Sequence, residues 1–502
     1  IGQSGSAGNV ITYGTYGTGA IPTVTGFTTV GAWTNLGSNI WESTSAVSTL
    51  STCDMVTING IQYAQGRTPN TGWYTYQTFS TNVSITSTDV NSAVINWTGA
   101  DVVIKKAHWV IDRNPITNHS GGTITYSNGS FYSGMANYGF FIQNDVRTLD
   151  AQNEWYYNPS TKKIRIYSTS QPVNVKVASV NNLFTATDVS YFTVNGLSFV
   201  GSNQNTIYLT KSSGDQYATI TNCNIDFSGR NAIGCFKSSH LTVSSCTINH
   251  TNNTAINLDP TKVSDTNSTY ALIDGNTIQK TGIFEGFGDN ANGVFIGINS
   301  TSPNLTAQHN LIENTGFNGI SFMNNDQLIQ NNFIDYCNIL KDDGGAIYTY
   351  IGNVGTTHTN RTISGNIILN VTGNGTGTAD GGLKGNGVYL DGYTINVDIL
   401  NNTIENVADA GIYLNGARNA RVRSNTVYNA SDQIYAYNWG ATLMSGNEIK
   451  KNILVSLNDN QRTLTFQALD ADILTFGVSD SNYYATVFSE RYPIHTVNAG
   501  NI

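Results

Sequence analysis

Three aspartates lie at the ends of strand-like runs. The segment KDDGGAIYTYIG at 341–352 places Asp342 and Asp343 at the entrance of one strand, and GNGVYLDGYT at 385–394 places Asp391 at the end of another. Cleavage of a glycosidic bond commonly uses two carboxyl groups about 5 to 9.5 Å apart, one as acid and one as nucleophile or base. A close acidic pair also raises the pKa of one member. We predict Asp343 and Asp391 as catalytic groups, supported by Asp342.

Two features oppose this prediction. Each aspartate is followed by glycine, a combination that is equally typical of turns between strands. Asp343 also precedes its strand whereas Asp391 follows its own, so a straight strand separates them by roughly 10 Å or more at about 3.3 Å per residue. If no bend joins them, the partners of Asp343 are instead Glu285, Asp289 or Asp380 from loops, and those of Asp391 are Asp342 or Tyr350.

Several other side chains are candidates for binding a sugar. A row of outward tyrosines can cover the apolar face of a pyranose, although packing beneath loops explains such a row equally well. The predicted substrate-binding residues are Tyr348, Tyr350, Tyr389, Tyr413, Asn415, Lys384, Glu285 and Trp439. Arg418, Arg421 and Arg423 form a local basic group, which is either solvated surface, a grip on a uronate or sulfate, or the base of a lyase. No cofactor is expected, and calcium is the one metal that the aspartates could bind.

Internal repeats position these residues. Asparagine begins strand-like segments at intervals as short as 22 or 23 residues, at Asn222, Asn276, Asn310, Asn332, Asn366, Asn402, Asn425 and Asn447. A second strand recurs between them, as AINL at 255, GVFI at 293, GISF at 319, AIYT at 346, GVYL at 387, GIYL at 411 and QIYA at 433. Its second and fourth residues should point inward.

This repetition predicts an all-β fold, the right-handed parallel β-helix, in which equivalent aliphatic residues of successive coils stack. Ile347 then lies beside Val388, and Tyr350 beside Asp391. The asparagines should form a ladder inside a turn, where they satisfy backbone groups and tolerate left-handed φ. Longer coils place extra loops near 284–305, 351–361 and 371–385, which are suited to form the walls of a cleft.

We predict three parts along the chain. Residues 1–109 read as N-terminal coils and a cap, 110–170 as an inserted antiparallel β-domain ending in EWYYNPSTKKIRIYST, and 171–502 as the main β-helix with closing strands. Cys223 and Cys246 lie one coil apart, either as stacked core residues or as a disulfide.

Composition limits the partners. The net charge of -9 and the absence of a Lys/Arg-rich segment disfavour nucleic acid, and no apolar run is long enough to span a membrane. Few charged residues and many tyrosines suit a polysaccharide or oligosaccharide partner. The chain reads as a mature product that is secreted or held at a cell surface, and self-association is possible.

The strings EWYYNPSTKKIRIY, KDDGGAIYTY and GVYLDGYTINVDILNNTI resemble segments of bacterial secreted β-helix enzymes, especially glycoside hydrolases of families 141 and 120. The resemblance implies a small inserted β-domain and a cleft lined by the Asp-Gly-Gly-Ala-Ile-Tyr and Tyr-Leu-Asp motifs. It also implies Asp343 and Asp391 as acid and nucleophile, without deciding which is which. Asp-Asp before the paired glycines departs from the family pattern.

Three functions fit the sequence. The first is an extracellular glycoside hydrolase with paired aspartates. The second is a polysaccharide lyase acting on a uronate with a base such as Lys384 or Arg421, with calcium bound by the aspartates as a variant of this mechanism. The third is a non-catalytic glycan-binding adhesin or fibre subunit.

Overall fold

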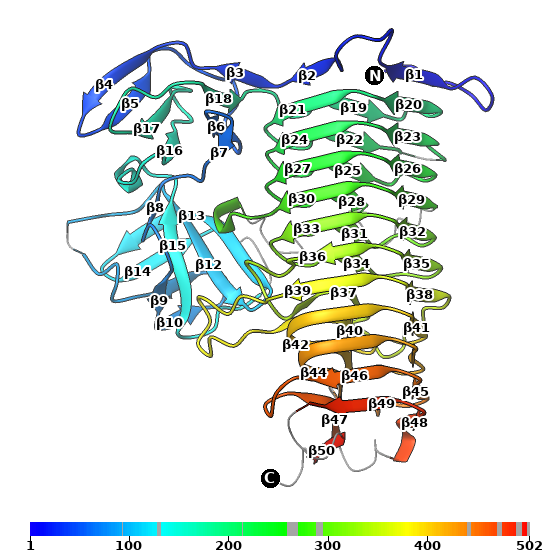
Figure 1. Ribbon diagram of the computed structural model, residues 1–502. Coiled ribbons are helices and arrows are strands. Elements are labelled where there is room, and N and C mark those ends of the chain that lie inside the picture. Colours follow the sequence, from blue (N-terminus) through cyan, green and yellow to red (C-terminus); the bar gives the residue numbers. More distant parts are fainter. Residues whose placement is uncertain are drawn as a thin grey trace.

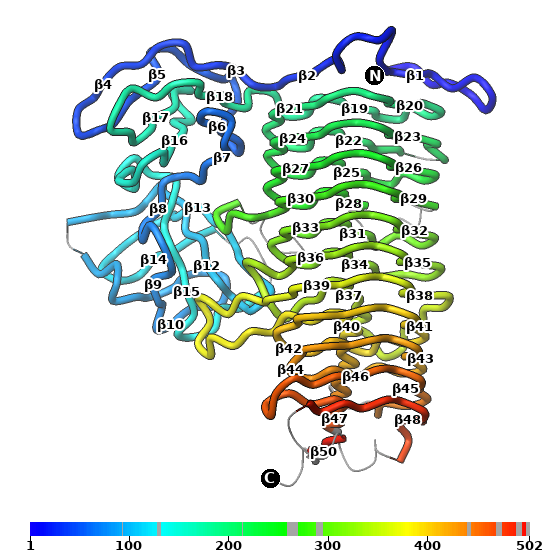
Figure 2. The backbone as a smooth tube through the Cα atoms, viewed as in Figure 1, coloured from blue at the N-terminus to red at the C-terminus, as the bar shows by residue number. Residues whose placement is uncertain are grey.

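Coils of short strands stack into a parallel β-helix, as the repeats predict (Figure 1). The computed structural model describes residues 1–92, 94–127, 132–212, 214–258, 270–287, 295–438, 443–468, 474–487 and 494–498. The tube in Figure 2 shows the coils stacked one below another from β20 at the top to β49 near the bottom, with the antiparallel strands to the left. Among the described residues, no helix is both long and apolar enough to cross a bilayer.

The described strands of the helix belong to two parallel sheets. One sheet has 12 described strands, which are β1 (Ile11–Gly14), β20 (Phe192–Asn195), β23 (Ala218–Thr221), β26 (Leu241–Ser244), β29 (Ala271–Asp274), β32 (Leu305–Gln308), β35 (Gln327–Gln330), β38 (Arg361–Ser364), β41 (Val397–Leu400), β43 (Arg421–Arg423), β45 (Asn447–Lys450) and β48 (Gly477–Asp480).

The other sheet bends around the helix and contributes two described strands, or one long strand, to most coils. Its 22 described strands are β2 (Thr23–Thr25), β19 (Phe184–Thr187), β21 (Ser198–Ser202), β22 (Ile207–Thr210), β24 (Asn224–Ser228), β25 (Ile233–Phe236), β27 (Thr247–Thr251), β28 (Ile256–Leu258), β30 (Thr277–Thr281), β31 (Ile298–Ser300), β33 (Leu311–Thr315), β34 (Ile320–Phe322), β36 (Phe333–Asp335), β37 (Gly344–Tyr350), β39 (Ile367–Val371), β40 (Gly385–Asp391), β42 (Thr403–Asn415), β44 (Thr426–Tyr437), β46 (Ile453–Ser456), β47 (Arg462–Ala468), β49 (Tyr483–Thr486) and β50 (Ile494–Asn498).

Three antiparallel sheets flank the helix. They contain β3 (Phe27–Thr29), β4 (Trp33–Gly37), β5 (Ile40–Ser43), β6 (Val56–Ile58), β7 (Ile61–Gln62), β8 (Arg67–Thr68), β9 (Tyr74–Tyr76), β10 (Thr78–Ser80), β11 (Ser84–Thr86), β12 (Asp101–Ala107), β13 (Val110–Ser120), β14 (Thr123–Tyr126), β15 (Tyr138–Gln143), β16 (Trp155–Tyr157), β17 (Ile164–Tyr167) and β18 (Val175–Ala178). Two short 3₁₀ helices are η1 (Val146–Thr148) and η2 (Glu285–Phe287).

The antiparallel region is larger than the expected segment 110–170. Of residues 1–109, only β1 and β2 join the parallel sheets, through β20 and β21, whereas antiparallel pairing runs from β3 to β18. The predicted boundary at residue 109 is therefore wrong. Polar and apolar residues alternate in both parallel and antiparallel strands, so the sequence pattern did not distinguish the early antiparallel strands from coils. β1 and β2 therefore cover the first coil, and the insertion follows them.

Aliphatic side chains stack in columns along the helix interior. Ile347 pairs with Val388, and Val388 pairs with Ile412, in the predicted register. All three side chains are fully buried. Of the predicted segment GVFI at 293, the structure describes only Phe295 and Ile296. The strand of this coil is β31, where Ile298 continues the column between Ile256 and Ile320. Phe295 and Ile296 from that segment pack instead against Phe141 and Val103 of the insertion.

A buried asparagine ladder fixes one corner of the coils. Each amide nitrogen donates to the side-chain oxygen of the next rung at 2.9 or 3.0 Å. The rungs are Asn276, Asn310, Asn332, Asn366, Asn402, Asn425, Asn452 and Asn482. Left-handed φ falls on the residue before each rung, for example Gly275 and Asn331, rather than on the rung itself.

Two of the predicted asparagines lie off the ladder. Asn222 is exposed and bonds to Asn195, and Asn447 satisfies backbone groups of Ala417 and Ala420. Cys223 and Cys246 occupy the ladder column in the early coils, as the Cys246 amide donates to Asn276 at 3.0 Å. Both thiols are free and buried, which agrees with stacked core residues and not with a disulfide.

We expect Asn366→Ala to lower the free energy of unfolding by about 3 kcal/mol, because it removes the buried hydrogen bonds of this side chain to Ile329, Asn332 and Asn402. The matched control is Gln330→Ala, which removes a half-exposed amide contact with Gln308 at an ordinary backbone conformation and should cost less than about 1 kcal/mol. Urea unfolding measures both variants, and hydrogen exchange in β36, β39 and β42 locates the change. Equal losses would contradict a stabilising role specific to the buried ladder.

Candidate functional site

The candidate site lies on β37, β40 and β42, where the register brings the predicted residues together. Tyr350 pairs with Asp391, and Tyr348, Tyr389 and Tyr413 occupy one row, as predicted. The rings of Tyr389 and Tyr413 stack at 4.6 Å, and Tyr348 meets Tyr389 edge to face at 5.3 Å. Tyr389 is only 3% exposed, so this row packs against itself and presents hydroxyl groups to the carboxylates.

Asp391 is held by three hydrogen-bond donors. Its Oδ2 accepts from the Tyr348 hydroxyl at 2.7 Å, and its Oδ1 accepts from the Asn415 amide and the Gly392 backbone N–H, both at 2.8 Å. Burial, followed by the Asp391 charge, raises the pKa of Tyr348 well above its ordinary value. Tyr348 therefore stays protonated and donates at all physiological pH values, which fixes the orientation of the carboxylate.

Asp343 lies within reach of Asp391 despite its place before the strand. Its φ of 55° is left-handed, a conformation that aspartate tolerates, and turns the chain as β37 begins. Tyr389 donates to Asp343 at 3.3 Å, and Asn415 donates to both the Tyr389 hydroxyl (3.2 Å) and Asp391 (2.8 Å). This chain of contacts limits the separation of the two carboxyl groups to about 9 Å, within the upper range used by glycosidases.

The glycine after Asp343 is required by packing. A Cβ on Gly344 would come within 2.4 Å of Phe317, Asn318 and Asn338. Gly344 also pairs with Gly385 on the next coil, where a Cβ would come within 2.5 Å of the backbone of Gly373. The paired glycines thus let the loop before β40 approach the strands closely.

The two catalytic candidates have different environments. Burial, and then the negative charge of Asp391, raises the pKa of Asp343 to about 6, against the opposing effect of Lys384 and His108. Both carboxyl groups are half-buried. Catalysis by a pair of carboxyl groups requires one group that can give up a proton and one that is ionised. The raised pKa of Asp343 suits the first role, and the hydrogen-bond donors around Asp391 suit the second.

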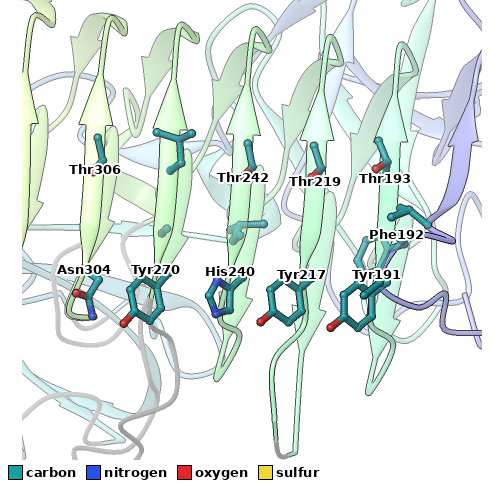
Figure 3. Close-up of a pocket in the computed structure, with 16 residues that line it drawn as sticks. Tyr191, Phe192, Thr193, Tyr217, Thr219, His240, Thr242, Tyr270, Asn304 and Thr306 are labelled. Atoms are coloured by element: carbon teal, nitrogen blue, oxygen red, sulfur yellow. The ribbon is translucent and has the colours of Figure 1, made fainter.

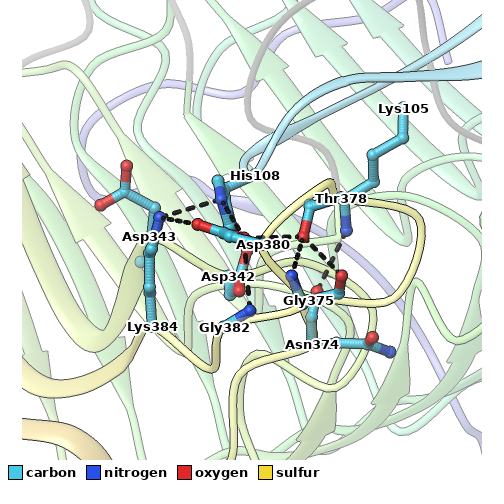
Figure 4. A network of polar contacts seen from close by, with 12 residues as sticks. Lys105, His108, Asp342, Asp343, Asn374, Gly375, Thr378, Asp380, Gly382 and Lys384 are labelled. Carbon is cyan, nitrogen blue, oxygen red and sulfur yellow. Dashed lines mark hydrogen bonds and ion pairs between the residues drawn. The ribbon is translucent and has the colours of Figure 1, made fainter. Parts of the chain in front are cut away.

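A network of polar contacts connects the insertion to the surroundings of Asp343 (Figure 4). His108 lies in the turn between β12 and β13, and its Nδ1 is 2.7 Å from Asp342. Its Nε2 is 2.9 Å from the Lys384 amine and 3.2 Å from Asp380. With Nδ1 donating to the Asp342 carboxylate, Nε2 accepts a hydrogen bond from the Lys384 amine.

The insertion is anchored around this network. Lys105 on β12 donates to the backbone carbonyls of Leu340 and Asn374, and the Gly139 amide donates to Gly377 at 2.7 Å. Asp342 is fully buried beneath His108, so it cannot meet a substrate. Asp342 can therefore support the site only through His108. It holds the imidazole, and the imidazole holds Lys384 beside Asp343.

Two nearby groups were not predicted as site residues. His108 gives no signal in the sequence, because only docking of the insertion brings it to Asp342. Asp409, on β42, does have a signal: it lies shortly before the Ile412-Tyr413 pair, as Asp343 lies shortly before Ile347-Tyr348. Burial, then the charges of Asp432 and Asp343, raises the pKa of Asp409 to about 7.

Other predicted residues lie elsewhere. Glu285 pairs with Arg67 at 3.4 Å, and Asp380, which bonds to Lys384 at 3.1 Å, is the loop acid that reaches the network. Trp439 and Asp289 lie outside the described residues. Arg421 pairs with Asp398, and Arg423 with Glu448, on the other sheet. Within the described part of the chain, no three His, Cys, Asp or Glu side chains form a group that could hold a metal ion.

The raised pKa values predict stabilising substitutions. A carboxyl group whose pKa is higher in the folded state stabilises the fold at low pH, and this contribution is lost as pH rises through the folded value. Asp343→Asn and Asp409→Asn should therefore each raise the free energy of unfolding at pH 8 by on the order of 1 kcal/mol, with little effect near pH 4. Thermal unfolding at both pH values measures this. Asp326→Asn, an exposed aspartate, is the control; equal responses of all three would contradict the explanation.

Comparison with known proteins supports the fold. Residues 162–334 match the family model described as "Right handed beta helix region", and a comparison with curated protein sequences finds no match. A solved structure described as a glycoside hydrolase is similar with a TM-score of 0.54 and 11% identity, over 94% of this chain and 82% of the other.

Two further solved structures are less similar. The catalytic unit of a GH87 α-1,3-glucanase from Streptomyces thermodiastaticus has a TM-score of 0.35 and 12% identity, over 94% of this chain and 87% of the other. PfbA, a surface adhesin of Streptococcus pneumoniae, has a TM-score of 0.37 and 12% identity, over 57% of this chain and 72% of the other. The family match over residues 162–334 and the similarity at a TM-score of 0.54 show a right-handed parallel β-helix and no activity.

Proposed function

We propose that this protein is an extracellular glycoside hydrolase that cleaves a polysaccharide with Asp343 and Asp391. The observation that carries the proposal is the chain of hydrogen bonds from Asp343 through Tyr389 and Asn415 to Asp391, which limits the separation of two half-buried carboxyl groups. The motifs around both residues, which resemble those of families 141 and 120, support the same assignment.

The surroundings of Asp343 and Asp391 favour a different catalytic role for each. Asp343, with a pKa raised to about 6, is the general acid that protonates the leaving oxygen. Asp391, oriented by Tyr348, Asn415 and the Gly392 amide, is the nucleophile or the base that activates water. Asp409 extends the acidic surface toward the next coil and is a candidate for contact with substrate hydroxyl groups.

The charges around the site favour a neutral or weakly acidic glycan. Lys384 is the cation facing Asp343, and it is already engaged by His108 and Asp380. Asp343, Asp391, Asp409 and Asp380 would repel a densely charged polyanion.

The test separates the two roles. On a polysaccharide found to be cleaved in a glycan panel, Asp343→Asn and Asp391→Asn should each lower kcat by about 10²- to 10⁴-fold. On an aryl glycoside with a good leaving group, which needs no protonation, Asp343→Asn should retain most activity whereas Asp391→Asn should not. Asp326→Asn is the control. Unchanged turnover by either site variant would remove that residue from its role.

Lys384 distinguishes hydrolysis from a lyase reaction. Because its positive charge lowers the pKa of Asp343, Lys384→Gln should raise that pKa and move the alkaline limb of kcat/KM to higher pH, while activity persists. Lys384→Arg keeps the charge and should leave the limb in place.

The lyase alternative is favoured by one observation, the contact between Lys384 and His108, which offers a base beside the carboxylates. In that case Lys384→Gln and Lys384→Arg would both abolish activity, and a uronate polymer would release products that absorb in the ultraviolet. Removal of calcium by a chelator would also slow the reaction if the aspartates bound the metal.

A further inference from the structure

A second row of aromatic residues lies on a different sheet from the candidate site. Tyr191, Tyr217, His240 and Tyr270 each precede a strand of the 12-stranded sheet, at equivalent corners of four successive coils (Figure 3). Neighbouring rings stack at 4.7, 4.3 and 4.8 Å and lie within 10° of parallel. We call these four residues the corner ladder.

The backbone at this corner is unfavourable for aromatic residues. The four φ angles are 55°, 49°, 55° and 61°, all left-handed. In the later coils the same corner holds residues that adopt this conformation readily, namely Asn304, Asp326, Asn360, Asn396 and Asn419. Bulky side chains in this region store strain, which is typical of functional positions. The rings are therefore placed where asparagine would fold more easily.

The corner ladder borders an open groove of about 690 Å³. A parallel row of hydroxyl groups, from Thr193, Thr219 and Thr242, lines the groove at the spacing of the strands, and Thr306 continues it farther on (Figure 3). Asn304 adds an amide at the far end. Two rows therefore run along the helix axis. The corner ladder presents the hydroxyl groups of its tyrosines, and the threonine row presents both hydroxyl and methyl groups.

The chemistry of this surface selects one class of ligand. Among the described residues that line the groove, His240 is the only one that can carry a charge near neutral pH. Asp215, which accepts a hydrogen bond from Tyr217 at 3.3 Å, adds a negative charge at the rim and disfavours a polyanion. Repeated hydroxyl and amide groups beside aromatic edges match a neutral ligand that itself repeats hydroxyl groups along an extended chain.

We propose that the corner ladder is a binding surface for a neutral polysaccharide chain that lies along the helix axis, separate from the carboxylates of the candidate site. The strands advance by about 4.8 Å per coil, which is close to the length of one sugar in an extended glycan. Successive coils can therefore present equivalent groups to successive sugars. The surface holds the polymer and performs no chemistry.

The experiment exchanges the strained aromatic residues for the residue of the later coils. The triple variant Tyr191→Asn, Tyr217→Asn and Tyr270→Asn removes three rings while fitting the left-handed backbone. Binding is measured by affinity electrophoresis in gels containing hydroxyethylcellulose, xylan, galactomannan or soluble starch, with polygalacturonate as the anionic comparison. Wild type should be retarded by at least one neutral polymer, and the triple variant should bind it at least tenfold more weakly.

Folding and catalysis are followed separately. The triple variant should keep a melting temperature within a few degrees of wild type, because relief of backbone strain offsets the lost stacking. Tyr483→Asn, which removes an exposed ring on β49, should bind as wild type does. The Asp343→Asn background should also retain the binding, so failure of the proposed hydrolase and failure of this surface are distinguished.

Two results would overturn the proposal: no retardation of wild type by any neutral polymer, and undiminished binding by the triple variant. If the triple variant loses binding together with a large fall in melting temperature, Tyr217→Phe, which keeps the ring and removes a hydroxyl, decides. This variant should fold normally and weaken binding, and unchanged binding would also overturn the proposal.

Discussion

In-register pairing between successive coils is the constraint on which this structure depends. Each of the strands β37, β40 and β42 hydrogen-bonds to the equivalent strand of a neighbouring coil, so residues 41 or 24 positions apart in sequence become neighbours. A shift of one residue would exchange the buried Ile347 column with the outward Tyr348 row. The asparagine ladder opposes such a shift, because each rung bonds to both the backbone and the side chain of its neighbours.

This constraint explains what the sequence could predict. Fold, register and the outward row of Tyr348, Tyr389 and Tyr413 follow from repeats alone, because equivalent positions must stack. The proximity of Asp343 and Asp391 did not follow, since a straight strand separates them. The left-handed turn at Asp343 and the hydroxyl of Tyr389, which reaches back along the strand, supply the connection.

The site residue that could not be predicted from the sequence lies outside the repeats. His108 lies in a hairpin of the insertion, and its meeting with Asp342 depends on docking between surfaces that have no common period. The limits of the insertion were equally hidden, since β14 and β17 alternate between buried and half-buried residues as coil strands do. Asp409 was within reach of sequence reasoning, because it lies shortly before an Ile-Tyr pair of the repeat, as Asp343 does.

The placement of β1 and β2 has a consequence for the order of folding. These strands are synthesised before the insertion, and their partners β20 and β21 follow only after it. The later coils close short loops with their neighbours and can propagate independently. The amino-terminal segment must wait unpaired until the insertion has been synthesised and β20 has formed, and closure of this long loop completes the end of the stack. The edge of β20, which would otherwise be open to another chain, is thereby paired with a segment that is synthesised before the insertion.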